Sequence, residues 1–235
     1  MCCSEARPLA FGCASDRLRW SLKHRNPRER WPAMTETPLT LDGSKTALLV
    51  VHLQPDIVAE RTAFGSMFNP QLRERNVLAH TKEAMEAVRQ AGGLVITLRI
   101  AFKPDYSDLI PSIPLLAMAQ GAGCLKDGTA EAEIVEDIKL GSNDLVVTHK
   151  RPGPFTGSNL QQTLDAEGIT NVVVCGIATN VSVEGAVRQA ADLGYSTFVL
   201  EDASSAADQV SHDAAIATMG LFAQAISVED LKTAF

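Results

Sequence analysis

The stretch VVVCGIATNVSVEG, residues 172–185, joins an apolar run to a tight turn and then to the start of a helix. The first four residues are too few for a buried helix and rich in β-branched side chains, so they predict a strand covered on both faces. Gly176 is expected to end this strand, and Asn180 is the expected N-cap of the helix. Ser182 then lies in the first helical turn, where unpaired backbone N–H groups can stabilise an oxyanion. The stretch therefore predicts an acyl-transfer site.

The rest of the chain alternates between strand and helix patterns. Further strands are predicted at residues 46–53, 94–99, 145–150, 195–200 and 225–227, and helices at 69–91, 130–138, 158–167 and 211–219. This alternation predicts a three-layer α/β, Rossmann-like fold with a central, mainly parallel six-stranded sheet. Segment 102–128 is rich in Pro and Gly and is expected to be a long loop with short helical turns, typical of a lid. Residues 1–38 are expected to be a disordered or mis-started N-terminal extension, followed by one domain at 39–235.

Composition excludes several classes of function. The longest apolar runs are far shorter than the roughly 20 residues of a membrane span, so no membrane partner is expected. Residues 34–235 carry 14 Lys and Arg against 25 Asp and Glu, a net charge of −11, which argues against binding to nucleic acid. The five cysteines show no paired spacing, so we expect a cytoplasmic protein without a disulfide framework or structural zinc.

Polar residues close three of the predicted strands. His52 ends the first, Lys150 ends the third, and Ser182 follows the fourth. Because parallel strands end at one edge of a sheet, we expect these three side chains to meet in one pocket. His149 alternates with Lys150 along its strand, so it is expected to face the other side of the sheet and to serve structure alone.

Three segments carry a resemblance to a known family: ALLVVHLQPDIV at 47–58, VVTHKRPGPFTGSNLQQTL at 146–164 and VVVCGIATNVSVEGAVRQAADLGY at 172–195. Together they resemble the isochorismatase-like hydrolase superfamily, which includes nicotinamidases, N-carbamoylsarcosine amidohydrolases and ureide hydrolases. The resemblance implies a hydrolase without a cofactor that acts on a small-molecule amide, ureide or related C–N substrate. It also implies a homodimer or homotetramer. Some relatives bind a metal after the second strand, but residues 98–108 contain no histidine, so no metal is expected.

The same resemblance assigns roles to individual residues. The family's cysteine hydrolases use an Asp, a Lys and a Cys at the positions that match His52, Lys150 and Ser182, so only the lysine is retained. The resemblance also implies a cis peptide at Ile177–Ala178 and an oxyanion held by the N–H groups of Ala178 and Ser182. A serine hydroxyl needs a base in contact, and an imidazole is a better base for it than a carboxylate. The expected reaction is attack by Ser182 with His52 as base, while Lys150 orients the substrate and stabilises charge.

Further residues are candidates for the pocket wall. Phe155 matches a family position that lines the pocket, and Phe64 and Phe102 are additional wall candidates. Gln54 is a candidate for substrate binding or for holding the loop after the first strand. Cys124, in the predicted lid, is an alternative, displaced nucleophile.

Two other functions stay open at this point. Family members that cleave isochorismate lack the cysteine and hydrolyse a vinyl ether by direct attack of water, without a covalent intermediate. Alternatively, the chain is a catalytically silent member kept as a binding or assembly module, because two of the three reactive positions differ from the family pattern. The sequence does not identify the substrate.

Overall fold

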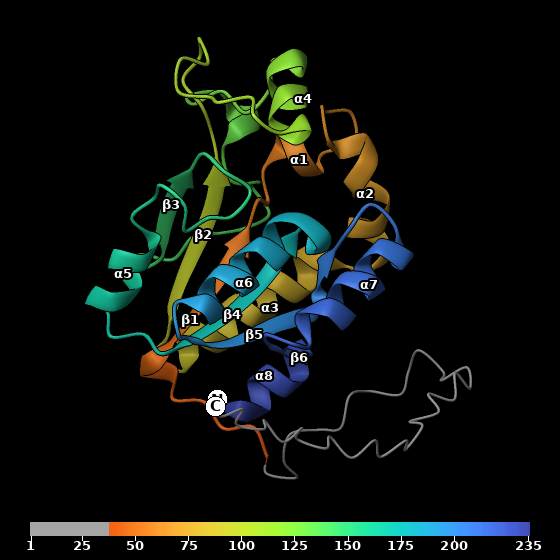
Figure 1. The fold of residues 1–235 in the computed structure, drawn as a ribbon. Coiled ribbons are helices and arrows are strands. Elements are labelled where there is room, and N and C mark those ends of the chain that lie inside the picture. Colours follow the sequence, from red (N-terminus) through yellow and green to blue (C-terminus); the bar gives the residue numbers. More distant parts are fainter. Residues whose placement is uncertain (1–37) are drawn as a thin grey trace, which may run out of the picture. The chain divides into compact units, whose positions relative to one another are not determined.

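The computed structural model describes residues 38–235, so the expectation of an N-terminal extension falls almost entirely outside the described residues. Six strands form its centre: β1 (Thr46–Val51), β2 (Leu94–Ile100), β3 (Leu145–His149), β4 (Asn171–Ile177), β5 (Ser196–Ser205) and β6 (Gln224–Ile226). They pair in parallel in the order β3-β2-β1-β4-β5-β6 (Figure 1). The structure confirms the predicted α/β fold. Every residue of β1 is buried, as expected for a strand covered on both faces.

Helices cover both faces of this sheet, which gives the three layers (Figure 1). They are α1 (Pro55–Val58), α2 (Gly65–Glu74), α3 (Val77–Gln90), α4 (Pro114–Ala122), α5 (Leu160–Ala166), α6 (Glu184–Asp192), α7 (Gln209–Met219) and α8 (Val228–Ala234). One hydrophobic core lies under α3 and α8, and a second lies under α5, α6 and α7. The side chains of β1 alternate between these cores, with Leu48 and Val50 in the first and Leu49 and Val51 in the second. The sheet is therefore packed on both faces, and this packing fixes the positions of its strand ends.

The helices differ from the sequence prediction in three places. The single helix predicted at 69–91 is divided into α2 and α3 by Asn76, whose φ of 51° is a left-handed conformation that Asn tolerates. The predicted loop at 102–128 contains α4, which begins at Pro114 and is followed by Gly123 at φ 69°. The predicted helix at 130–138 is only a 3₁₀ turn, Ala130–Ala132.

The turn after β4 also differs from the prediction. The strand continues through Gly176, whose φ is 116°, and a Cβ there would lie 2.2 Å from the carbonyl oxygen of Val51. The peptide Ile177–Ala178 is cis, as the resemblance implied. A π-helical turn, η3 (Thr179–Val183), then leads into α6, so Asn180 lies inside the turn and is not its N-cap. Ser182 is thus placed on a tight π-helical turn rather than in an ordinary first helical turn.

The sheet order decides where a site can form. The chain leaves β1 for α3 over one face and leaves β4 for α6 over the other face. Because β1 and β4 are neighbours, their connections separate and leave a crevice at the carboxyl ends of these two strands. Within residues 38–235, no helix combines the length and apolar character needed to cross a membrane.

Candidate active site

A pocket of about 50 Å³ lies at this edge of the sheet. Its base is formed by strand ends: His52 after β1, Ile100 at the end of β2, and Ile177, Ala178 and Ser182 at the end of β4 and in the turn that follows. Its walls are apolar and come from the segment after β1 (Ile57, Phe64, Phe68) and from α4 (Leu115, Leu116, Ala119). The expectation that the strand ends carry the site therefore agrees with the position of the pocket. Figure 1 shows α1, α2 and α4 gathered beyond the ends of β1 and β2.

His52 contacts a second histidine that the sequence analysis had set aside. The Nε2 atoms of His52 and His149 are 2.9 Å apart, and the two rings are stacked with centroids 4.8 Å apart. Nδ1 of His149 lies 2.7 Å from the carbonyl oxygen of Arg151. Both histidines are buried. The expectation that His149 faces away from His52 is wrong, because the alternation along β3 separates His149 from Lys150 but does not say which of them points to the pocket.

The hydrogen bonds of this pair decide which ring nitrogens carry protons. Burial lowers the pKa of His52 well below its usual value, with the neighbouring His149 as a second cause, and burial lowers the pKa of His149 to about 4. Both rings are therefore neutral at pH 7. The Arg151 carbonyl only accepts, so His149 carries its proton on Nδ1 and its Nε2 accepts. It follows that His52 donates from Nε2 and that its Nδ1 has a free lone pair.

The side chain of Lys150 contacts the segment that follows β2. Its ammonium nitrogen lies 2.7 Å from a carboxylate oxygen of Asp108 and donates at 2.7 Å to the carbonyl of Ala101. It is also 5.7 Å from the ring centroid of Phe102 and does not line the pocket. The contacts found for the Lys150 side chain among the described residues are therefore with Ala101, Phe102 and Asp108, and its convergence with His52 and Ser182 stays a prediction. Lys150 ties the segment that carries α4 to the end of β3, and His149 lies next to His52.

Ser182, Ala178 and Phe64 are where the sequence analysis expected them. All three line the pocket, and Ser182 is only 3% exposed. Ser182, His52 and the turn that begins after Ala178 therefore line one small cavity.

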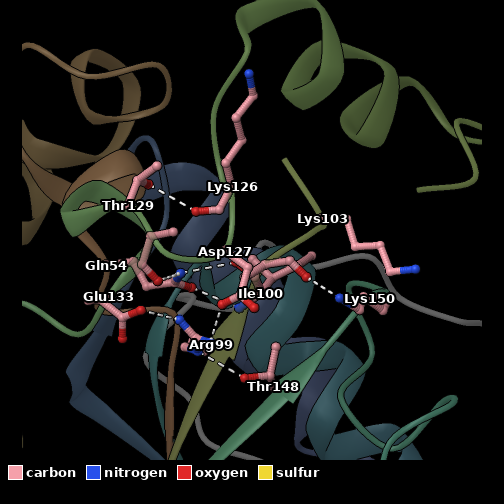
Figure 2. Close-up of polar contacts among 12 residues, drawn as sticks. Gln54, Arg99, Ile100, Lys103, Lys126, Asp127, Thr129, Glu133, Thr148 and Lys150 are labelled. Atoms are coloured by element: carbon pink, nitrogen blue, oxygen red, sulfur yellow. Dashed lines mark hydrogen bonds and ion pairs between the residues drawn. The ribbon is translucent and has the colours of Figure 1, made fainter. Parts of the chain in front are cut away.

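Three other wall candidates lie elsewhere. Phe155 packs against Tyr195, with ring centroids 6.3 Å apart, in the core under α5, α6 and α7. Phe102 is fully buried and does not line the pocket. Gln54 uses its amide on backbone groups: it donates to the carbonyls of Ile100 and Ala132 and accepts from the Ile100 N–H (Figure 2). Gln54 therefore holds the loop after β1, which was the second of its two predicted roles.

The two cysteines within residues 38–235 do not supply a nucleophile. Burial raises the pKa of Cys124 to about 11, and its thiol contacts the carbonyl of Ala119 at 3.5 Å rather than the pocket. Burial likewise raises the pKa of Cys175 to about 12. Neither thiol forms a thiolate near neutral pH, so a displaced cysteine nucleophile is not supported. Among residues 38–235, no group of three or more His, Cys, Asp and Glu side chains is arranged to hold a metal ion.

The chain resembles known proteins in sequence. A family model, the isochorismatase domain, matches residues 46–230. The isochorismatase family protein YwoC of Bacillus subtilis is 30% identical over 178 residues, which are 76% of this chain and 87% of that protein. The ureidoacrylate amidohydrolase RutB of Rhizobium rhizogenes is 30% identical over 195 residues, covering 76% of this chain and 79% of that protein.

Solved structures show the same fold. A cysteine hydrolase from Pseudomonas syringae pv. phaseolicola matches with a TM-score of 0.74 at 21% identity, over 86% of this chain and 100% of that one. N-carbamoylsarcosine amidase from Thermoplasma acidophilum matches with a TM-score of 0.63 at 23% identity, over 79% of this chain and 97% of that one. Since the domain model spans most of the sequence, the chain belongs to the isochorismatase family.

Proposed function

We propose that this protein hydrolyses a C–N bond of a small amide, ureide or related substrate, with Ser182 as nucleophile and His52 as its base. The observation that carries the proposal is the neutral His52 ring, which lines the same pocket as Ser182 and has an unprotonated Nδ1. Two kinds of relative support the reaction type, since RutB is named an amidohydrolase and a protein of the same fold is named an amidase.

In the proposed reaction one proton is transferred twice, first from Ser182 to His52 and then from His52 to the leaving nitrogen. As the Ser182 oxygen attacks the carbonyl carbon, its proton moves to Nδ1 of His52, and the N–H groups of Ala178 and Ser182 hold the oxyanion. The protonated His52 then gives this proton to the leaving nitrogen, which departs as an amine or ammonia. Water, activated by His52, finally cleaves the acyl–serine ester.

His149 is the positioning residue in this scheme. It accepts the Nε2–H of His52 at 2.9 Å and is itself fixed by the Arg151 carbonyl at 2.7 Å. This chain of bonds keeps the lone pair of His52 on Nδ1. When His52 becomes positively charged, its Nε2 proton can move to His149, so that the charge is shared by two rings.

The proposal differs from the vinyl ether alternative in the chemistry required of His52. Cleavage of a vinyl ether begins with proton donation to the substrate, whereas the hydrogen bonds of the histidine pair leave Nδ1 of His52 with a lone pair and no proton. The geometry therefore supports a base better than an acid at this position.

The test is turnover of small amides and ureas by the wild type and two variants. Ser182→Ala is expected to lower kcat by at least about 1000-fold, as loss of a serine nucleophile does in other hydrolases. Cys124→Ala is the matched control and should leave kcat within about two-fold, because its thiol lies outside the pocket. Mass spectrometry after mixing with 4-nitrophenyl isobutyrate should find an acyl group on Ser182. Full turnover by Ser182→Ala would refute the serine mechanism, and an absence of turnover and acylation in the wild type would favour the silent binding module.

A further inference from the structure

Apart from His52 and Ser182, the side chains that line the pocket are apolar. Among the side chains that line it, only His52 and Ser182 can form hydrogen bonds, and none carries a charge at neutral pH. The remaining side chains are aliphatic or aromatic. They come from the ends of β2 and β4, from η3, from the α1–α2 segment, from α4, and from the segments that follow α4 and β3, which supply Leu125 and Pro152. A bound substrate therefore meets an apolar wall everywhere except at its reacting carbonyl.

Two ionisable side chains near this wall, Asp56 and Lys150, already have partners. The carboxylate of Asp56, next to the wall residue Ile57, accepts the N–H of Leu125 at 2.6 Å. The ammonium of Lys150 is paired with Asp108 at 2.7 Å. Neither side chain lines the pocket. Among the described residues that line the pocket there is no Lys or Arg, so a carboxylate on the substrate would meet no cation in the wall itself to replace its lost hydration.

We infer that the substrate is a small uncharged amide or urea with a short apolar acyl or alkyl group, and that acidic amides are excluded. This inference rests on the proposed function, because it takes His52 and Ser182 to mark the reacting end of the pocket. The volume sets the size: about 50 Å³ holds roughly four water molecules, and hence an acyl chain with a similar number of non-hydrogen atoms. The ureidoacrylate in the name of the RutB relatives is a carboxylate and lies outside this class.

Three amides of nearly equal shape test this inference. In 3-methylbutanamide an isopropyl group occupies the place of the carboxylate of malonamate, and malonamide puts a neutral amide there. We expect kcat/KM for 3-methylbutanamide to exceed that for malonamate by at least about 100-fold, which is the scale of an unpaired buried charge. Malonamide should fall between them, because it is polar but uncharged. Direct binding of the same compounds to Ser182→Ala, measured by ligand-observed NMR, should give the same order without turnover.

A charge introduced into the wall provides a second test. Leu115, a half-buried residue of α4, lines the pocket. Leu115→Arg is expected to strengthen binding of malonamate by at least about 10-fold and to weaken that of 3-methylbutanamide. Leu115→Met is the control of similar size and should preserve the wild-type order. Unchanged thermal unfolding of both variants shows that they fold.

The outcomes separate this inference from the proposed function. Selective binding of 3-methylbutanamide without hydrolysis by the wild type refutes the proposed hydrolase and supports the neutral pocket. Equal or tighter binding of malonamate to Ser182→Ala overturns the inference even if amides are hydrolysed. Binding of none of the three compounds also overturns it.

Discussion

Replacing His149 tests whether His149 keeps the proton of His52 on Nε2. We call this hydrogen-bonded pair of buried histidines, His52 and His149, the relay. His149→Leu removes an acceptor for the His52 Nε2–H and a donor to the Arg151 carbonyl, at 2.9 and 2.7 Å. Each hydrogen bond contributes about 1 kcal/mol, and its buried partner loses more when it is left unpaired, so the free energy of unfolding should fall by about 2–4 kcal/mol. His149→Gln keeps an oxygen acceptor for His52 and should lose about half of that.

The relay also predicts a change in catalysis that a purely structural role would not cause. Without an acceptor at its Nε2, His52 is free to move its proton to Nδ1, where it can no longer act as base for Ser182. We expect kcat to fall by about 10- to 100-fold in His149→Leu with little change in KM, and to recover in part in His149→Gln.

Imidazole ¹⁵N shifts measure the protonation states directly. In the wild type, His52 should be protonated on Nε2 and His149 on Nδ1. In His149→Leu, signal from the Nδ1–H form of His52 should appear. If wild-type His52 already carries its proton on Nδ1, or if His149→Leu keeps full kcat, the relay is refuted.

Three further predictions concern stability. Burial lowers the pKa of His149 from its usual value of 6.5 to about 4. Between pH 6.5 and pH 4, His149 therefore binds a proton in the unfolded chain but not in the folded chain. The free energy of unfolding should fall as the pH drops through this range. Urea titrations should show this loss to be larger, by about 3 kcal/mol, in the wild type than in His149→Gln. Gly176→Ala should lower the free energy of unfolding by at least about 3 kcal/mol, whereas Gly121→Ala in α4, with open space around its Cβ, should change it by less than about 1 kcal/mol. Lys150→Met should increase proteolysis of the α4 segment, with a coupling to Asp108→Asn of under about 1 kcal/mol because both side chains are partly exposed.

Each of these three stability predictions would be contradicted by a specific result. Equal pH dependence in the wild type and in His149→Gln would mean that His149 titrates normally in the folded state. Normal stability of Gly176→Ala would show that β4 can move away from β1. Unchanged proteolysis of Lys150→Met would show that the ion pair does not hold the α4 segment.

The strands were predictable because their signal is local. A run such as ALLVV in β1 or VVVC in β4 is apolar at every position, and only a strand covered on both faces of a sheet buries such a short run completely. The error at 69–91 arose because a single residue interrupts a helical pattern of apolar residues. This residue is Asn76, whose left-handed backbone divides α2 from α3. Pro114 and Gly123, which delimit α4, are also local signals, so this helix could have been predicted from the sequence.

The candidate site was predictable only in part. His52 and Ser182 follow apolar strands, and parallel strands end at one edge of the sheet, so the sequence predicts that they lie at the same edge; the pairing of β1 with β4 then brings them to one pocket. The choice between His149 and Lys150 could not be made in this way, because alternation fixes the two faces of a strand relative to each other and not which of them meets a neighbour. That choice depends on how the end of β3 packs beside β2 and β1, where His149 reaches His52 and Lys150 is paired with Asp108. The apolar walls likewise depend on where α4 docks, and packing between distant segments, rather than any local pattern, decides that.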